Sequence, residues 1–147
     1  MKFSRRKALQ TGVCIGVTSL TGCLNITTPF SSKLTVELLN YDDDPHTIDL
    51  QILRADGKQN SEATVHSGWH ELPARDDEPS HRLLEDIVAS DRYLIRARLL
   101  ESENEVFDHY HYYPDCGGNS TDDKVGVKIE KNETKGLFID FDQNSCS

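Results

Sequence analysis

The sequence has few of the features by which enzymes and nucleic-acid-binding proteins are recognised. It contains no Gly-x-Ser-x-Gly nucleophile motif, no His-Glu-x-x-His zinc motif and no glycine-rich phosphate loop. Basic residues are scarce, since 16 Lys and Arg stand against 25 Asp and Glu, a net charge of −9. Because such a charge repels phosphate backbones, it argues against nucleic acid as a partner. We therefore expect neither an enzyme nor a nucleic-acid-binding protein.

The chain also lacks an apolar run long enough to span a membrane. Its sustained apolar segment, residues 11–20, has about half the length that a membrane helix needs. A basic stretch that includes Arg5 and Arg6 precedes this segment, and the small residues Thr21 and Gly22 follow it. This order of basic, apolar and small residues is typical of a secretory signal that is removed after export.

Two motifs in this signal resemble known export and anchoring sequences. The adjacent Arg5 and Arg6 resemble the twin-arginine export signal, whose substrates cross the membrane already folded. Leu-Thr-Gly-Cys at residues 20–23 resembles the lipobox of prokaryotic lipoproteins, in which the chain is cut before a lipidated cysteine. The resemblance implies a signal peptide over residues 1–22 and a mature chain that begins at Cys23. It also implies a lipid anchor on the extracellular face of the cell membrane.

The mature chain would be strongly acidic. Removal of residues 1–22 takes away four basic residues and no acidic one, which leaves 12 Lys and Arg against 25 Asp and Glu and a net charge of −13. The acids are scattered, for example in residues 42–44, 76–78 and 101–105, so they favour a solvated surface over one acid-lined cation site. With the two export motifs, this composition resembles the exported proteins of salt-loving archaea.

Cysteine is rare in the body of the protein. Beyond Cys14 in the signal and the proposed lipid site Cys23, the chain has Cys116 and Cys146. Two cysteines in an oxidising compartment most simply form a disulfide. Closing a loop of about 30 residues would stabilise the fold by roughly 3–4 kcal/mol. A catalytic thiol or a pair of metal ligands is the alternative.

Period-two alternation of apolar residues dominates the rest of the chain. Residues 23–32 are rich in Ser and Thr and suit a flexible tether, and the domain is expected to start near Lys33. Strands are expected at 34–38, 48–52, 63–65, 69–72, 93–99, 105–113, 125–129 and 137–141. Residues 82–88 fit a helix or a strand. Seven or eight short strands separated by turns predict an all-β antiparallel sandwich over residues 33–147.

The order of strands and turns resembles a group of haloarchaeal domains. Asn-Tyr-Asp-Asp-Asp-Pro-His at 40–46, Asp-Arg-Tyr-Leu-Ile-Arg-Ala-Arg at 91–98 and Pro-Asp-Cys-Gly-Gly at 114–118 resemble the small immunoglobulin-like or cupredoxin-like domains of haloarchaeal surface lipoproteins of unknown role. The resemblance implies an immunoglobulin-like sandwich and no particular activity. A blue copper site needs a thiolate, two histidines and usually an axial methionine near the last loop. No histidine follows His111 and the only methionine is Met1, so the sequence argues against a copper electron carrier.

Two histidines form the sharpest candidate metal site. On a strand, His109 and His111 face the same side, so both imidazoles could meet one ion. His46, His66, His70 or an acid could complete the shell. The alternative is a partly solvated aromatic face made by Phe107, His109, His111 and Tyr113. The Asp run at residues 42–44 could hold calcium, but it lacks the spacing of an EF-hand loop and is better explained as a solvated turn.

Surface features complete the sequence-based prediction. Asn119 and Asn132 head glycosylation sequons in expected turns. Tryptophan and tyrosine side chains could form a binding patch or fill the core; these are Tyr41, Trp69, Tyr93, Tyr110, Tyr112 and Tyr113. We expect a lipid-anchored, non-catalytic binding or scaffolding module without a cofactor, whose partner is an unknown envelope protein or ligand. The alternative is a metal-binding or metal-delivery lipoprotein that uses His109 and His111.

Overall fold

The computed structural model describes residues 32–56, 63–100, 104–115 and 123–144. These residues form eight strands: β1 (Lys33–Asn40), β2 (His46–Arg54), β3 (Thr64–Leu72), β4 (Ser80–Ala89), β5 (Tyr93–Leu99), β6 (Phe107–Tyr112), β7 (Asp123–Asn132) and β8 (Gly136–Gln143). This part of the chain contains no helix that is both long and apolar enough to cross a membrane. The first strand begins at Lys33, where the sequence places the start of the domain.

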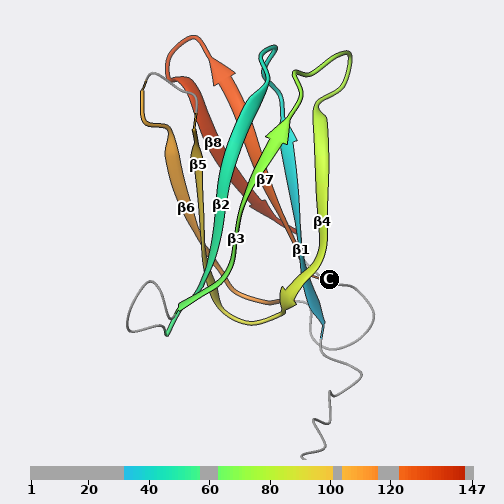
Figure 1. Cartoon of the computed structure of the whole chain (residues 1–147), viewed down its shortest axis with the longest axis vertical. Coiled ribbons are helices and arrows are strands. Elements are labelled where there is room, and N and C mark those ends of the chain that lie inside the picture. The colour runs from blue at the N-terminus through green and yellow to red at the C-terminus, as the bar shows by residue number, and fades with distance from the viewer. Residues whose placement is uncertain (1–31, 57–62, 101–103, 116–122, 145–147) are drawn as a thin grey trace, which may run out of the picture.

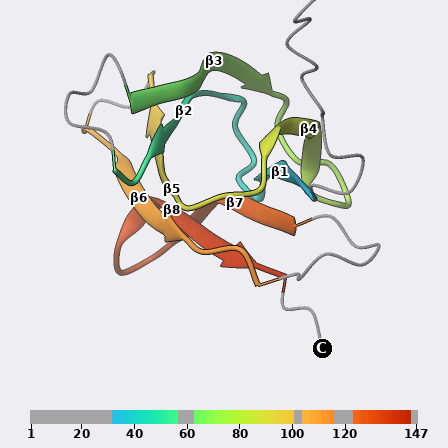
Figure 2. The ribbon, with the colours of Figure 1, turned by 90° about the horizontal axis from the view of Figure 1, so that it is seen from below.

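The strands form two four-stranded sheets that pack face to face (Figures 1 and 2). Sheet I has the order β4-β1-β7-β8 and sheet II has the order β3-β2-β5-β6. All neighbouring strands are antiparallel except β1 and β7. The chain between β1 and β7 passes through the other sheet, which supplies the long connection that a parallel pair requires. The predicted all-β sandwich is confirmed, with one parallel pair in an otherwise antiparallel arrangement.

The core lies between the sheets and follows the alternation read from the sequence. Successive side chains on a strand point to opposite faces, so every second residue enters the core. The central strands supply its buried side chains: Leu34, Val36, Leu38, Ile48, Leu50, Ile52, Ile95, Ala97, Leu99, Val125, Val127 and Ile129. Burying each large aliphatic side chain contributes about 1.5–3 kcal/mol. The opposite faces of the two sheets carry mostly polar and charged residues, with a few exposed apolar side chains among them.

Strand β3 differs from the prediction. The two short strands expected at residues 63–65 and 69–72 are one continuous strand, so that prediction was wrong. The inward positions of its middle are occupied by His66, Gly68 and His70, which pair with the buried Ile52, Leu50 and Ile48 of β2. Because these three residues are polar or small, the apolar alternation is interrupted although the backbone stays extended.

Strand β4 contains residues 82–88, for which the sequence allowed either a helix or a strand. Residues 82–88 lie in a strand, and their helix-like apolar spacing arises from an irregularity in the ladder. The pairing register of β1 with β4 shifts between Leu34 and Val36, and Asp86 has a φ of 52°. The backbone N–H of Asp86 donates to Thr35 Oγ1 at 3.3 Å. A bulge inserts residues into one strand, and this restores the inward direction of the apolar side chains on either side of it.

Candidate functional site

Most of the residues predicted for export, lipid anchoring, disulfide formation and glycosylation lie outside the described ranges. These residues are Arg5, Arg6, Cys23, Cys116, Asn119 and Cys146. Asn132 is described, and it is exposed at the end of β7 in the hairpin turn that leads to β8. Its side-chain oxygen accepts hydrogen bonds from the N–H groups of Thr134 at 3.1 Å and Lys135 at 2.6 Å. The predicted turn around this sequon is therefore present.

The structure keeps the candidate metal histidines in separate places. His109 and His111 are exposed on β6, with ring centroids 5.8 Å apart and ring planes at 80°. The nearest ionic partner of His109 is Asp108, whose Oδ1 lies 3.9 Å from Nδ1. His66 and His70 lie on β3, which is at the opposite edge of sheet II from β6, and they point toward the core. Within the described ranges, no three His, Cys, Asp or Glu residues are grouped to hold a metal ion.

The acidic turn at residues 42–44 is closed by ion pairs. Asp42, which is 5% exposed, accepts a hydrogen bond from His46 Nε2 at 2.8 Å and lies 3.5 Å from Lys131 Nζ. Asp43 pairs with the exposed Arg75 at 2.6 Å. Burial would raise the pKa of Asp42, but the His46 hydrogen bond, a backbone N–H and Lys131 outweigh it and hold the pKa below its usual value. These contacts fit a structural turn better than a calcium loop.

The strand register places polar, charged and aromatic residues side by side on the outer face of sheet II. One row of cross-strand neighbours runs across all four strands and consists of Trp69, Asp49, Arg98 and Phe107. The next row consists of Ser67, Gln51, Arg96 and His109. We call these eight residues the binding face. Because antiparallel partners lie directly opposite one another, residues up to 60 positions apart in the sequence form one continuous surface.

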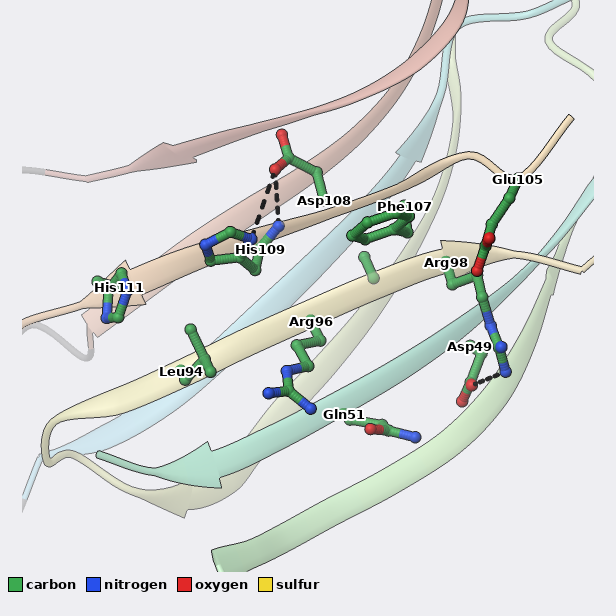
Figure 3. A pocket seen from close by; sticks show the side chains of 11 residues that line it. Asp49, Gln51, Leu94, Arg96, Arg98, Glu105, Phe107, Asp108, His109 and His111 are labelled. Carbon is green, nitrogen blue, oxygen red and sulfur yellow. Dashed lines mark hydrogen bonds and ion pairs between the residues drawn. The ribbon is translucent and has the colours of Figure 1, made fainter. Parts of the chain in front are cut away.

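A hollow of about 480 Å³ lies over β2, β5 and β6 within this face (Figure 3). It is lined by Asp49, Gln51, Leu94, Arg96, Ala97, Arg98, Glu105, Phe107, Asp108, His109 and His111. Both signs of charge are therefore present within one shallow depression, beside an exposed aromatic ring. The candidate histidines His109 and His111 belong to this hollow.

Asp49 is the unusual residue of the binding face. Its side chain is 6% exposed although it lies on the outer side of the sheet, and its Oδ2 accepts a hydrogen bond from Arg98 at 3.0 Å. Its other oxygen, Oδ1, is buried and has no hydrogen-bond partner among the described residues. A buried acceptor without a donor costs about 1–3 kcal/mol, and more when the group is charged. The fold therefore holds a polar atom in an environment that a ligand donor would improve.

Two aromatic side chains stand at the ends of the same row. Trp69 is 73% exposed and Phe107 is 63% exposed, the two highest values among the large apolar residues of the described structure. Two of the tyrosines considered for a binding patch, Tyr93 and Tyr112, are instead buried and stack in the core with ring centroids 6.3 Å apart. The solvated face predicted for β6 and the residue that follows it is confirmed, because Phe107 and Tyr113 are both more than half exposed.

Comparison of the chain with models of protein families and with curated proteins finds no match.

Proposed function

We propose that the protein is a lipid-anchored envelope protein whose sandwich binds neutral, hydroxyl-rich glycans through the binding face and catalyses no reaction. The observation that carries this proposal is the row in which Trp69 and Phe107 flank the ion pair of the buried Asp49 and the half-exposed Arg98. Exposed aromatic rings offer apolar contact area, and planar polar groups between them offer fixed hydrogen-bond directions.

The charges on the face select the chemistry of the ligand. A phosphate or carboxylate ligand would meet Arg96 and Arg98, but the carboxylates of Asp49 and Glu105 would repel it. An ammonium ligand would meet the opposite conflict. A hydroxyl group both donates and accepts, so it can accept from the guanidinium of Arg96, which has no ion-pair partner among the described residues. It can donate to the buried Asp49 Oδ1 when the half-exposed Arg98 side chain, which pairs with the other oxygen of Asp49, moves aside for the ligand.

The spacing of the aromatic rings indicates the size of the ligand. Trp69 and Phe107 are on strands β3 and β6, which are separated by three strand intervals, or about 14 Å at the usual spacing of about 4.8 Å. The apolar C–H face of a sugar ring can pack on each aromatic ring while its hydroxyl groups meet the polar residues between them. A chain of a few sugar units fits this span.

The anchoring part of the proposal is supported by the sequence motifs and is tested separately. Cys23→Ser removes the proposed lipidation site, so the protein should leave the membrane fraction or remain unprocessed. Changing Arg5 and Arg6 to Lys should stop export through the twin-arginine route. Unchanged membrane retention of the Cys23 variant would count against the anchor, and normal export of the Lys variant would indicate the general secretion route.

Glycan binding is tested with the single tryptophan of the chain as the reporter. The full chain, purified in detergent, is titrated with neutral oligosaccharides and with glycans released from the envelope of the producing cells. Acrylamide quenching of Trp69 fluorescence should decrease on binding, because a sugar that stacks on the indole shields it. Phe107→Ala should weaken binding roughly tenfold, equivalent to about 1.4 kcal/mol.

The matched control is Leu83→Ala, which removes an exposed apolar side chain, 43% exposed, from the other sheet. It should leave binding unchanged. If no neutral glycan protects Trp69, or if Phe107→Ala and Leu83→Ala behave alike, the proposed ligand class is wrong. Protection of Trp69 by an envelope protein instead would assign the same face to a protein partner and would also overturn the glycan proposal.

A further inference from the structure

Strand β3 carries a second unusual group on its inner side. His66, Gly68 and His70 occupy alternate positions, so all three point toward the core side of sheet II. Both histidine side chains are partly buried, and Arg82 of β4 is close enough to His70 to lower its pKa. This group is separate from the binding face, which lies on the other side of the same sheet.

The two imidazole rings converge over the glycine. A Cβ atom placed on Gly68 would lie 3.3 Å from His70 Nε2 and 3.8 Å from His66 Nε2, so both nitrogens approach the same point. The ring centroids are 6.1 Å apart and the ring planes differ by 7°. On an extended strand, residues four apart are roughly 13 Å from each other along the chain, so both side chains lean inward. The absence of a side chain at Gly68 leaves the space that they share.

Neither converging nitrogen has a partner. His66 Nε2 and His70 Nε2 are both buried and make no hydrogen bond among the described residues. Burial lowers the pKa of both histidines, and Arg82 and His66 add to this effect at His70. An imidazole nitrogen that carries no proton is an efficient metal ligand. An orphaned pair of such atoms is costly unless something binds between them.

We propose that His66 and His70 bind one Cu(I) ion between their Nε2 atoms, as the two ligands of a linear site. Metal–imidazole bonds are about 2.0 Å long, so a linear arrangement places the ring centroids roughly 6 Å apart, close to the observed 6.1 Å. Monovalent d¹⁰ ions accept two collinear nitrogen ligands, whereas divalent zinc requires four. The proposal is independent of glycan binding.

Local charge and space favour this ion over other ligands. Arg82 adds a positive charge beside His70, which opposes a divalent cation more strongly than a monovalent one. Arg82 would favour an anion, but the two nitrogens expose less than 1 Å² each and leave no room at them for a water-sized group. A bare ion small enough to lie between the nitrogens meets both conditions.

The test measures metal binding by the full chain after its thiols have been blocked by alkylation. Ag(I), an air-stable substitute for Cu(I), is titrated in chloride-free nitrate buffer, and Cu(I) is titrated anaerobically against a coloured chelator. One ion should bind per chain, and X-ray absorption should show two nitrogen ligands. His66→Ala and His70→Ala should each weaken binding at least about 100-fold, since loss of a ligand costs more than loss of its outer partners.

Two further variants make the result specific. Gly68→Ala keeps both histidines but puts a methyl group into the shared space, so it should weaken binding roughly tenfold or more. The double change His109→Ala/His111→Ala removes the exposed pair and should leave binding unchanged. Circular dichroism confirms that each variant is folded. Binding that survives loss of both His66 and His70, binding that depends on His109 and His111, or tighter binding of Zn(II) than of Cu(I) would each refute the proposal.

Discussion

The pair of Asp49 and Arg98 allows function to be separated from stability. Within the part of the chain that the structure describes, Arg98 at 3.0 Å satisfies one Asp49 oxygen and the other has no partner; Asp49 is 6% exposed and Arg98 is 51% exposed. Arg98→Thr alone leaves the buried carboxylate with neither oxygen bonded in the described structure. Breaking a fully buried pair costs about 3–5 kcal/mol, and water around the exposed arginine reduces this, so we expect a loss of about 1–3 kcal/mol.

Replacing both partners should have a much smaller effect. In Asp49→Val/Arg98→Thr, the buried position receives an apolar residue and the half-exposed position a polar one, and both residues favour strands. Replacing a buried ion pair by well-packed residues is often neutral or stabilising, so the free energy of unfolding should remain within about 1 kcal/mol of the unmodified protein. Glycan binding should be lost, because the acceptor and donor between the aromatic rings are gone.

The assay is urea-induced unfolding followed by far-ultraviolet circular dichroism. Tryptophan fluorescence is unsuitable here, because Trp69 is already 73% exposed in the folded protein. Stability and Trp69 protection by glycan are measured on the same samples. If the double variant is as unstable as Arg98→Thr, the pair is a structural element. If the double variant still binds glycan, Asp49 has no role in the site. Either result would refute the reasoning that the pair is retained for binding.

Three further predictions concern the rest of the domain. Asp42→Asn should destabilise the protein at neutral pH. The difference in unfolding free energy between the variant and the unmodified protein should shrink as the pH falls below 3.8, because the lowered pKa of Asp42 contributes stability only while the carboxylate is ionised. A difference in urea midpoint that does not change with pH would contradict this. Tyr112→Phe removes a buried hydroxyl that lies 3.1 Å from Ser90 Oγ, and it should cost about 1–2 kcal/mol by chemical denaturation; no loss would show that the contact is unimportant. Mass analysis after alkylation should find no modified cysteine in residues 33–147 if Cys116 and Cys146 form the predicted disulfide, and alkyl groups on both would rule it out.

The strands were predictable where one face is apolar and the ladder is regular. Strands β1, β2, β5, β7 and β8 were located from alternation alone. The alternation failed at β3, where the inward residues are His66, Gly68 and His70, and at β4, where the irregularity near Asp86 changes the period. In both strands the backbone hydrogen bonds to a neighbouring strand determine the structure, and the pattern within the segment does not reveal them.

The binding face was less accessible to sequence analysis than the fold. Trp69 was recognised as a possible contact residue, but its alignment with Asp49, Arg98 and Phe107 depends on the register of four strands. Register is fixed by the packing of the inner faces and by the turns, so no local signal in any of the four segments contains it. The convergence of His66 and His70 could have been suspected from His-x-Gly-x-His, since a glycine at the middle inward position leaves room between two long side chains.

The charged residues on the outer face of sheet I are paired with one another more fully than those on the outer face of sheet II. This difference supports placing the binding face on sheet II. On sheet I, Lys124 pairs with Glu37 at 2.5 Å and Lys128 pairs with Asp142 at 2.7 Å. The Asp142 carboxylate lies over Gly126, where a side chain would obstruct it, so the backbone itself accommodates the second pair. Exposed pairs of this kind contribute little stability, but they leave few groups in need of a ligand.

Sheet II shows the opposite arrangement. Its outer face leaves Asp49 Oδ1 without a donor among the described residues and exposes two large aromatic rings to water. The proposed tether precedes β1, which belongs to sheet I, so the proposed lipid anchor and the binding face would be attached to different sheets. A domain tethered through one sheet can present the outer face of the other to its surroundings. Sheet I, next to the proposed tether, therefore has paired charges, whereas sheet II exposes polar and apolar groups that lack partners among the described residues. This division suits the proposed surface-anchored binding module.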